Sequence, residues 1–460
     1  MNNGQVVFGI AMGLLASTAT AQEAQPPTTS DESVANVMEP PLDLPGHERG
    51  ERDKDEAPKP KEPKATPEAE REWFGHKPLW EWSRVTGDWG GARTKLENLG
   101  IEFAGSYTLD WSSVWSGGVK NVASTRSLLD LNLTFDLEKL AGLSGGKVFA
   151  DFYSTDMRGG SRDVGDFQGV SNIETGDNLD QLAELWYEQH LFKDFLRLKV
   201  GKMDAAGEFA FVSHNEDNLH GGAGCVLTIP GYPTYPDPAM GVVLFAYPTE
   251  WLYIGGGLFD GATLDGFATG RRGPETFFND DKSDSWLWMG ELGVTWNELW
   301  SMGAGRAAGG VWHHTHNFDR FDGGVESDAT GFYALIEQQL VKHGEGDAAS
   351  EHGLFCWLQY GCADEDILDV SQHLGAGLVL KGTFTGREDD NVGTWLSWID
   401  LSDDQSAGYA DDEIAWEFYY KCQVTPSFSI RPDLQFVFNP SGDEAIDDAV
   451  VGGLRFEVAF

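Results

Sequence analysis

The final residues of this 460-residue chain alternate between apolar and polar side chains. In the segment 450–460, apolar side chains occupy one face of an extended strand: Leu454, Phe456, Val458 and Phe460. The opposite face carries Arg455, Glu457 and the small Ala459. A last strand of this kind, closed by a Phe, is the usual ending of a bacterial outer-membrane β-barrel, where one face meets lipid and the other meets water. The alternative is a half-buried strand at the edge of a soluble domain.

The segment 129–138 shows the same alternation over ten residues. Its apolar face consists of Leu129, Leu131, Leu133, Phe135 and Leu137, and polar side chains lie between them. Ten residues is about the length that a tilted strand needs to cross a bilayer. The sequence has no run of eighteen apolar residues, which excludes a helical membrane protein.

Segments with this period predict sixteen antiparallel strands, near residues 103–115, 126–138, 146–155, 182–191, 195–202, 240–247, 251–259, 286–296, 304–314, 329–341, 353–362, 373–384, 393–400, 412–424, 427–438 and 449–460. We assign 222–229 to a loop, because glycines and prolines flank it and single-chain barrels have even strand numbers. Connections such as 140–146 are short, whereas 157–180 and 259–285 are long and polar. The predicted fold is an all-β transmembrane antiparallel barrel with short periplasmic turns, long extracellular loops and a water-filled lumen.

The first part of the chain differs in composition. An apolar stretch at residues 6–16 is followed by Ala19-Thr20-Ala21, which predicts a signal peptide over residues 1–21. Residues 22–78 are rich in Pro, Glu and Lys and predict a disordered periplasmic linker, with a cell-wall contact as the alternative. A short helix is predicted at 92–99, ended by Gly100. The barrel is predicted to occupy residues 79–460.

Charge and cysteine content narrow the partners. The net charge of -42 argues against nucleic acid, whose phosphates attract basic surfaces.

The four cysteines are Cys225, Cys356, Cys362 and Cys422. Cys356 and Cys362 lie on one strand face about 20 Å apart, beyond disulfide reach, so we expect small apolar side chains that point at lipid. The sequence contains no C-x-x-C pair, so it does not predict a zinc site.

Two motifs could carry chemistry. Gly142-Leu-Ser144-Gly-Gly146 matches the G-x-S-x-G pattern of hydrolases, but a strand follows it where that motif needs a helix, which favours a tight turn. His314 and His316 share a strand face, but two ligands do not make a metal site without a third. Carboxylates are so frequent that no acid–base pair stands out. We therefore expect no enzyme activity, no metal and no cofactor.

Several segments together resemble the carbohydrate-selective porins of bacterial outer membranes. Thr86-Gly-Asp-Trp-Gly-Gly-Ala-Arg93, with the residues up to Phe103, resembles the family's G-D-W-G-G-x-R-x-x-L-x-x-x-G-I opening. The other matching segments follow in order: 136–142, 185–189, 201–209, 386–390, 419–420 and 431–440. The resemblance extends from about residue 80 to residue 460. It implies an outer-membrane barrel that passes sugars by passive diffusion through a constriction. At 354–361 it leads us to expect a basic residue, where Trp357 and Leu358 stand.

Sugar passage needs a wet, narrow path that replaces the hydrogen bonds of water. By alternation, the candidates that face the lumen are Asp130, Asn132, Glu184, Trp186, Glu188, Arg197 and Lys199. The loop 157–180 could fold inward as the constriction and carries Arg158, Arg162 and Phe167. Aromatic faces would stack on sugar rings, and charged groups would bind hydroxyls.

Several functions stay open at this point. A sugar porin predicts passive flux without turnover, and a general-diffusion porin predicts flux ranked by size. An outer-membrane barrel enzyme predicts turnover and a placed nucleophile, which the sequence does not show. A structural barrel tethered to the cell wall predicts little flux. The expected partners are small sugars, outer-membrane lipid and lipopolysaccharide, and a second copy of the chain in a homo-oligomer. The expected location is the outer membrane of a bacterium.

Overall fold

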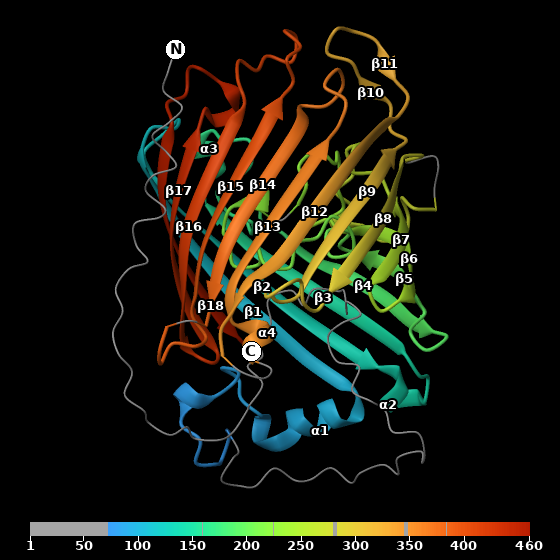
Figure 1. Ribbon diagram of the computed structural model, residues 1–460, viewed down its shortest axis with the longest axis vertical. Helices are drawn as coiled ribbons and strands as arrows, with labels where there is room; N and C mark the ends of the chain where they lie inside the picture. Colours follow the sequence, from blue (N-terminus) through green and yellow to red (C-terminus); the bar gives the residue numbers. More distant parts are fainter. Residues whose placement is uncertain (1–71, 159, 224, 279–282, 345–347, 383) are drawn as a thin grey trace. The chain divides into compact units, whose positions relative to one another are not determined.

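The structure, a computed structural model, describes residues 72–158, 160–223, 225–278, 283–344, 348–382 and 384–460. The predicted signal peptide and most of the predicted linker lie outside these residues. The described residues form a closed antiparallel barrel (Figure 1). Its strands are β1 (Ile101–Ser116), β2 (Ala123–Asp136), β3 (Gly146–Arg158), β4 (Asp180–Leu191), β5 (Leu196–Met203), β6 (Ala239–Thr249), β7 (Leu252–Asp260), β8 (Trp286–Trp296), β9 (Gly305–His314), β12 (Ala329–Lys342), β13 (Gly353–Cys362), β14 (Val370–Lys381), β15 (Asn391–Leu401), β16 (Glu413–Thr425), β17 (Phe428–Phe438) and β18 (Ala449–Ala459).

Each barrel strand pairs with its neighbours in the chain, and β1 pairs with β18 to close the cylinder. The strands β10 (Phe318–Asp319) and β11 (Val325–Glu326) form a separate hairpin between β9 and β12. Closure removes the unpaired edges that a sheet cannot leave in hydrocarbon. The sixteen predicted strands are confirmed, and the described part of 222–229 lies in a loop.

Outward and inward faces differ as the alternation predicted. In β1, Tyr107 and Trp111 are exposed on the outer face, whereas Asp110 between them is buried inside and binds Arg455 of β18. Large exposed apolar side chains cover the outer face of the other strands, among them Leu133, Leu185, Leu244, Ile254, Trp288, Leu292, Phe332, Ile336, Leu358 and Leu378. In a protein of this fold such a surface is the one that lipid covers.

Four short helices lie between or before the strands: α1 (Ala92–Leu99), α2 (Leu137–Ala141), α3 (Ser161–Val164) and α4 (Ala348–Glu351). The predicted helix 92–99 is confirmed, and Gly100 ends it with φ 93°. The prediction that the second strand continues to residue 138 was wrong. Asp136 accepts the main-chain N–H groups of Glu138 and Lys139, which starts α2 in place of further strand. None of the described helices is long and apolar enough to span a membrane.

All four cysteines are free. Cys356, Cys362 and Cys422 occupy outward positions of β13 and β16. Cys225 lies in the long connection between β5 and β6.

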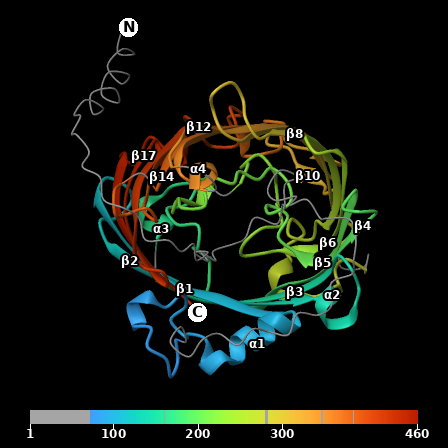
Figure 2. The same cartoon turned by 60° about the horizontal axis from the view of Figure 1, so that its bottom comes forward.

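Two connections turn into the barrel and fill much of its interior (Figure 2). We call residues 160–179, between β3 and β4, the first inward loop, and residues 204–238, between β5 and β6, the second inward loop. The sequence predicted a polar inner face throughout, but much of the wall under the second inward loop is aromatic. Buried inward side chains there are Tyr253, Trp312, Tyr333, Trp357, Trp395 and Tyr419, which belong to one core with Phe209, Val212 and Val226 of the loop. The loop thus gives the inner wall an apolar face to pack against. Trp357, which stands where the family resemblance led us to expect a basic residue, is part of this apolar core.

Candidate permeation pathway

A cluster of charges on β4 and β5 faces the lumen. The register places Glu188 opposite Lys199, with Arg197 beside them. Arg197 Nε lies 2.7 Å from Glu188, and Arg197 Nη2 and Lys199 Nζ lie 2.7 Å and 2.8 Å from Glu208 of the second inward loop. All four side chains are buried. Such charges are tolerated inside a protein only when they are paired and hydrogen-bonded, so the loop and the wall hold each other here.

Trp186 lies in the same cluster, but its ring is covered. Phe149 stacks on it with ring centroids 4.9 Å apart and planes 22° apart, and Lys199 Nζ lies 3.9 Å from the ring centroid. The indole N–H donates to Glu184 at 3.1 Å. Trp186 therefore positions Lys199 and offers little free ring surface for a sugar.

The first inward loop is fastened to the wall across the lumen from β4 and β5. Glu413 of β16 accepts the main-chain N–H groups of Phe167 and Gln168 at 2.7 Å and 3.1 Å. Gln435 of β17 donates to the Val170 carbonyl at 3.0 Å. Buried main-chain groups must find partners, and the wall supplies them in place of water.

The closing pair of strands makes a second attachment for this loop. Arg455 of β18 binds both carboxylate oxygens of Asp110 of β1 at 2.7 Å. Ser171 donates to the same carboxylate at 2.6 Å, and Arg455 also donates to the Asn172 side chain at 2.7 Å. The bidentate pair fixes the guanidinium, so two loop residues are held by rigid partners.

The second inward loop follows the inner wall from β5 to β17. Inward glutamates of three strands accept its main-chain N–H groups: Glu291 from Ala210, Glu337 from Ser213, and Glu417 from Leu219 and His220, at 2.6–3.1 Å. His373 of β14 accepts the Leu227 N–H at 3.2 Å. The wall carboxylates thus act as anchors for a loop whose own backbone has no sheet to join.

Asp217 is the most strongly held residue of this loop. Its carboxylate lies 2.8 Å from Lys421 Nζ and 3.0 Å from Arg431 Nη2, and Asn391 also donates to it at 2.6 Å. Burial alone would raise the pKa of Asp217, but Lys421 and Arg431 outweigh it and hold that pKa well below its ordinary value. The residue is therefore ionised at neutral pH and ties the loop to β16 and β17.

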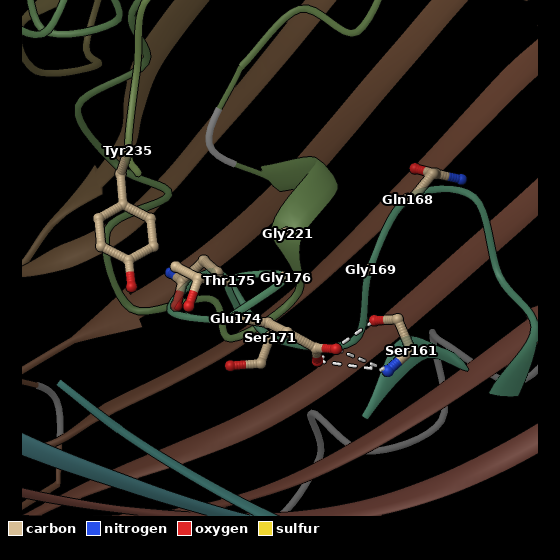
Figure 3. A pocket seen from close by; sticks show the side chains of 10 residues that line it. Ser161, Gln168, Gly169, Ser171, Glu174, Thr175, Gly176, Gly221 and Tyr235 are labelled. Carbon is tan, nitrogen blue, oxygen red and sulfur yellow. Dashed lines mark hydrogen bonds between the residues drawn. The ribbon is translucent and has the colours of Figure 1, made fainter. Parts of the chain in front are cut away.

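A polar cavity of about 290 Å³ lies between the two inward loops. The first loop lines it with hydroxyl, amide and carboxylate groups: Ser161, Gln168, Ser171, Asn172, Glu174 and Thr175. Figure 3 shows the ring of Tyr235 from the second loop on one side, and Glu174 on the other, where it accepts the Ser161 N–H at 3.0 Å. Arg126 Nε of β2 lies 3.3 Å from the Glu174 carboxylate. One aromatic face beside many hydroxyl-binding groups is an arrangement suited to a neutral polar solute.

The candidates chosen from the sequence occupy two regions. Five of them meet on the inner wall at β4 and β5: Glu184, Trp186, Glu188, Arg197 and Lys199. Asp130 and Asn132 lie on β2, and the register across β3 places Asn132 in line with Asp151 and Glu184. Phe167 and Arg162 lie in the first inward loop, where Phe167 is bound to Glu413 far from that cluster and Arg162 is exposed. The side chain of Arg158 lies outside the described residues.

Sequence reasoning missed the second inward loop and its anchors. Glu291, Glu337 and Glu417 each stand at an inward position, two residues after an apolar inward residue, which is Met289, Leu335 or Ala415. A carboxylate in such surroundings needs a partner, so these glutamates were a usable signal that something folds against them. The other signal was the length of the connection between the predicted fifth and sixth strands, which is 37 residues (203–239).

The two motifs considered for chemistry have structural roles. Ser144 lies in the turn before β3 and donates to Glu138 at 3.1 Å. His316 pairs with Asp265 at 2.9 Å, while His314 accepts the His316 N–H. Within the described residues, no group of three or more His, Cys, Asp or Glu side chains is arranged to hold a metal ion.

Arg197→Ala is expected to make the channel prefer cations. The change leaves Glu188 and Glu208 with Lys199 as their remaining close cation in the cluster, so the lumen becomes more negative, and we expect the cation-to-anion permeability ratio to rise roughly twofold or more. Reversal potentials in a KCl gradient measure this ratio. Lys193→Ala removes the same charge from an exposed turn and is the control. Unchanged selectivity and conductance would remove Arg197 from the conducting path.

Acid pH is expected to weaken the attachment at Asp217. Because its folded pKa lies below the unfolded one, its stabilisation is present above about pH 4 and is lost as pH falls through the folded pKa. We expect the unsubstituted protein to melt above Asp217→Asn at pH 6, with the difference shrinking steadily as pH falls below about 4. Calorimetry in detergent measures both. Burial lowers the pKa of His214 to about 4, which destabilises both proteins equally on acidification, so the difference between them is diagnostic. A difference in melting temperature that is as large at pH 2 as at pH 6 would contradict the ion pairing.

Comparisons with known proteins point to the same architecture. The family model described as carbohydrate-selective porin, OprB family, matches residues 120–460. Porin B of Pseudomonas aeruginosa is 24% identical over 428 residues, which cover 82% of this chain and 91% of that protein. A putative porin, QuiX, of Acinetobacter baylyi is 24% identical over 419 residues, which cover 82% and 93%. The high-pH structure of Pseudomonas putida OprB superimposes with a TM-score of 0.71 at 20% identity and covers 83% of this chain and 99% of that one.

Proposed function

The chain belongs to the OprB family of carbohydrate-selective porins, and from this premise we propose that carbohydrates cross a bacterial outer membrane through the cavity between its two inward loops. Family and fold are those of a porin that passes carbohydrates by passive diffusion. The observation that carries the finer proposal is the cavity of about 290 Å³, which has Tyr235 on one side and hydroxyl, amide and carboxylate groups on the other. Its volume is near the lower end for ligand pockets, about 300–1,000 Å³, which suits a solute of one sugar ring.

The attachments of the loops support this proposal. Both loops are held by buried ion pairs and main-chain hydrogen bonds, so the cavity is lined by fixed groups rather than by loose chain. Weak binding by fixed groups speeds entry of a dilute solute, provided that release stays fast. Channels of this kind do no chemistry, and we expect the sugars to emerge unchanged. Contacts with lipopolysaccharide and a homo-oligomer stay predictions from the sequence.

Liposome swelling tests the function. Purified protein is reconstituted, and its fold is checked by heat-modifiable gel mobility. Entry of a graded series of neutral sugars is then compared with entry of amino acids and salts of similar size. Faster entry of sugars than of size-matched solutes is the expected result. Entry ranked by size alone would make the chain a general-diffusion porin, and no entry through a folded barrel would favour a structural barrel.

A further inference from the structure

Residues 72–99, which we call the rim segment, bind the ends of the two strands that close the barrel. Arg93 Nη2 donates to the main-chain oxygen of Phe460 at 2.9 Å and also to that of Phe103. The Val85 N–H donates to the Ala459 carbonyl at 2.8 Å. Arg93 is 2% exposed, so these bonds fix the segment at the level where β1 begins and β18 ends.

Arg93 donates hydrogen bonds to main-chain oxygens that lie beyond the end of the β1–β18 pairing. Pairing between β1 and β18 stops at Ser106 and Ala459, so the first residues of β1 have no β18 partner on that side. Unpaired carbonyl oxygens at the edge of hydrocarbon cost several kcal/mol each. The guanidinium supplies donors there, and the rings of Trp89 and Phe103 lie 5.1 Å and 5.6 Å from it.

The contact with Phe103 shows on which side of the wall the segment lies. Inward positions of β1 have even numbers, such as Thr108 and Asp110, so Phe103 occupies an outward position. The ring of Trp89 is 5.7 Å from the ring of Phe103. In Figure 2 the rim segment, in blue, lies outside the ring of strands along the rim at β1. The segment therefore adjoins the lipid-facing surface at the end of the barrel that carries the short turns, which is the periplasmic end in barrels of this fold.

The rim segment exposes large apolar side chains although it belongs to no barrel strand. Phe74 is 88% exposed, Leu79 and Trp80 are each 67% exposed, and Leu99 is 60% exposed. The segment also has four acidic and four basic residues, whereas the chain as a whole has a net charge of -42. Exposed Trp, Phe and Leu without excess negative charge are typical of segments that lie in a membrane interface.

We propose that the rim segment is an interfacial membrane anchor, which buries Phe74, Leu79 and Trp80 among the phospholipid headgroups of the periplasmic leaflet beside the closing strands. Its apolar surface continues the outward surface of β1 through Phe103, and lipid is the partner that already covers that surface. The anchor shields the β1–β18 pair, the one contact of the barrel whose strands are far apart in the chain.

A fluorescent label reports the surroundings of Trp80. Trp80→Cys is made in a background in which the four native cysteines are Ser, labelled with an environment-sensitive dye, and placed in phospholipid nanodiscs. Lipids with a nitroxide near the headgroup should quench this label at least threefold more than a label at Gln405→Cys, an exposed loop residue at the other end of the barrel. Equal quenching at the two positions would overturn the proposal and point to a cell-wall or protein partner.

A second variant separates anchoring from mere proximity. Phe74, Leu79 and Trp80 are all changed to Ser, and the label is placed at Leu99→Cys. Quenching at residue 99 should fall by half or more while heat-modifiable mobility shows an intact barrel. Undiminished quenching would mean that the three side chains do not hold the segment in lipid, and would overturn the proposal.

If the serine background does not fold, quenching of tryptophan emission by lipids brominated near the headgroup should be smaller in Trp80→Phe than in the unsubstituted protein. An equal value would again reject the anchor.

Discussion

Asp217→Ala is expected to detach the second inward loop from β16 and β17 near residue 217. It should lower the free energy of unfolding by about 3–5 kcal/mol, the cost of removing one partner from a buried ion pair. After the change Arg431 stays buried and Lys421 stays partly buried, with no carboxylate at their 3.0 Å and 2.8 Å contacts. Arg431 keeps a longer contact of 3.8 Å to Glu457. Arg431 also donates to the main-chain oxygen of residue 217 at 2.8 Å, but that bond does not neutralise its charge. Temperature-dependent gel mobility and calorimetry measure the loss.

The same variant is expected to raise the single-channel conductance. With the ion pair gone, the loop keeps its bonds to Glu417 through Leu219 and His220, but the adjoining residues are free to leave the wall. Recordings in planar bilayers should show a larger and noisier conductance than that of the unsubstituted channel.

A double variant distinguishes charge pairing from loss of packing. Asp217→Asn with Arg431→Met removes both charges and keeps side chains of similar size, so it should recover most of the stability that Asp217→Ala loses. Lys421 then keeps its charge, but it is more exposed than Arg431, with 12% of its side-chain surface accessible against 3%. If the double variant is as unstable as Asp217→Ala, the ion pair is not what holds the loop.

Alternation predicted the barrel well because it depends on local chemistry. In β18, charged Arg455 and apolar Phe456 must face opposite sides of any strand that crosses a membrane. Each strand therefore carries its own signal, and sixteen such signals define a closed barrel. Asp136 shows the limit of local reasoning. The apolar pattern continued to residue 138, but the strand ends at Asp136 because its side chain caps the start of α2.

The interior could be predicted only in part, because it depends on long-range contacts. Arg197 and Glu188 were found since both are polar residues on inward positions, and register brings them together. Their third partner, Glu208, comes from a loop whose path no local pattern specifies. Trp357 shows the same effect in reverse: it is apolar at an inward position because the second inward loop covers it. A strand that is apolar on both faces shows no alternation of apolar and polar residues. Alternation therefore could not predict that the second inward loop covers this part of the inner wall.

Tyr235→Ala is expected to slow sugar entry by about two- to tenfold at low sugar concentration, which corresponds to the 0.5–1.5 kcal/mol that a well-placed aromatic contact contributes. The ring forms one side of the cavity and is held in place by the bond from its hydroxyl to the Ile173 carbonyl at 2.8 Å. Ion conductance should stay equal or rise, because removal of the side chain widens the path. Liposome swelling and planar-bilayer recordings on the same preparation measure the two quantities.

The opposite signs of these two effects make the result decisive. A side chain that only narrows the path would, once removed, speed the entry of sugars and ions together. A side chain that binds solutes weakly would, once removed, slow dilute sugars alone, since a lower occupancy of the cavity reduces their flux. Tyr235→Phe keeps the ring and loses only the hydroxyl bond to Ile173, so sugar entry should stay near that of the unsubstituted protein. Faster sugar entry in Tyr235→Ala would move the selective contact away from this cavity, to the charged cluster around Arg197.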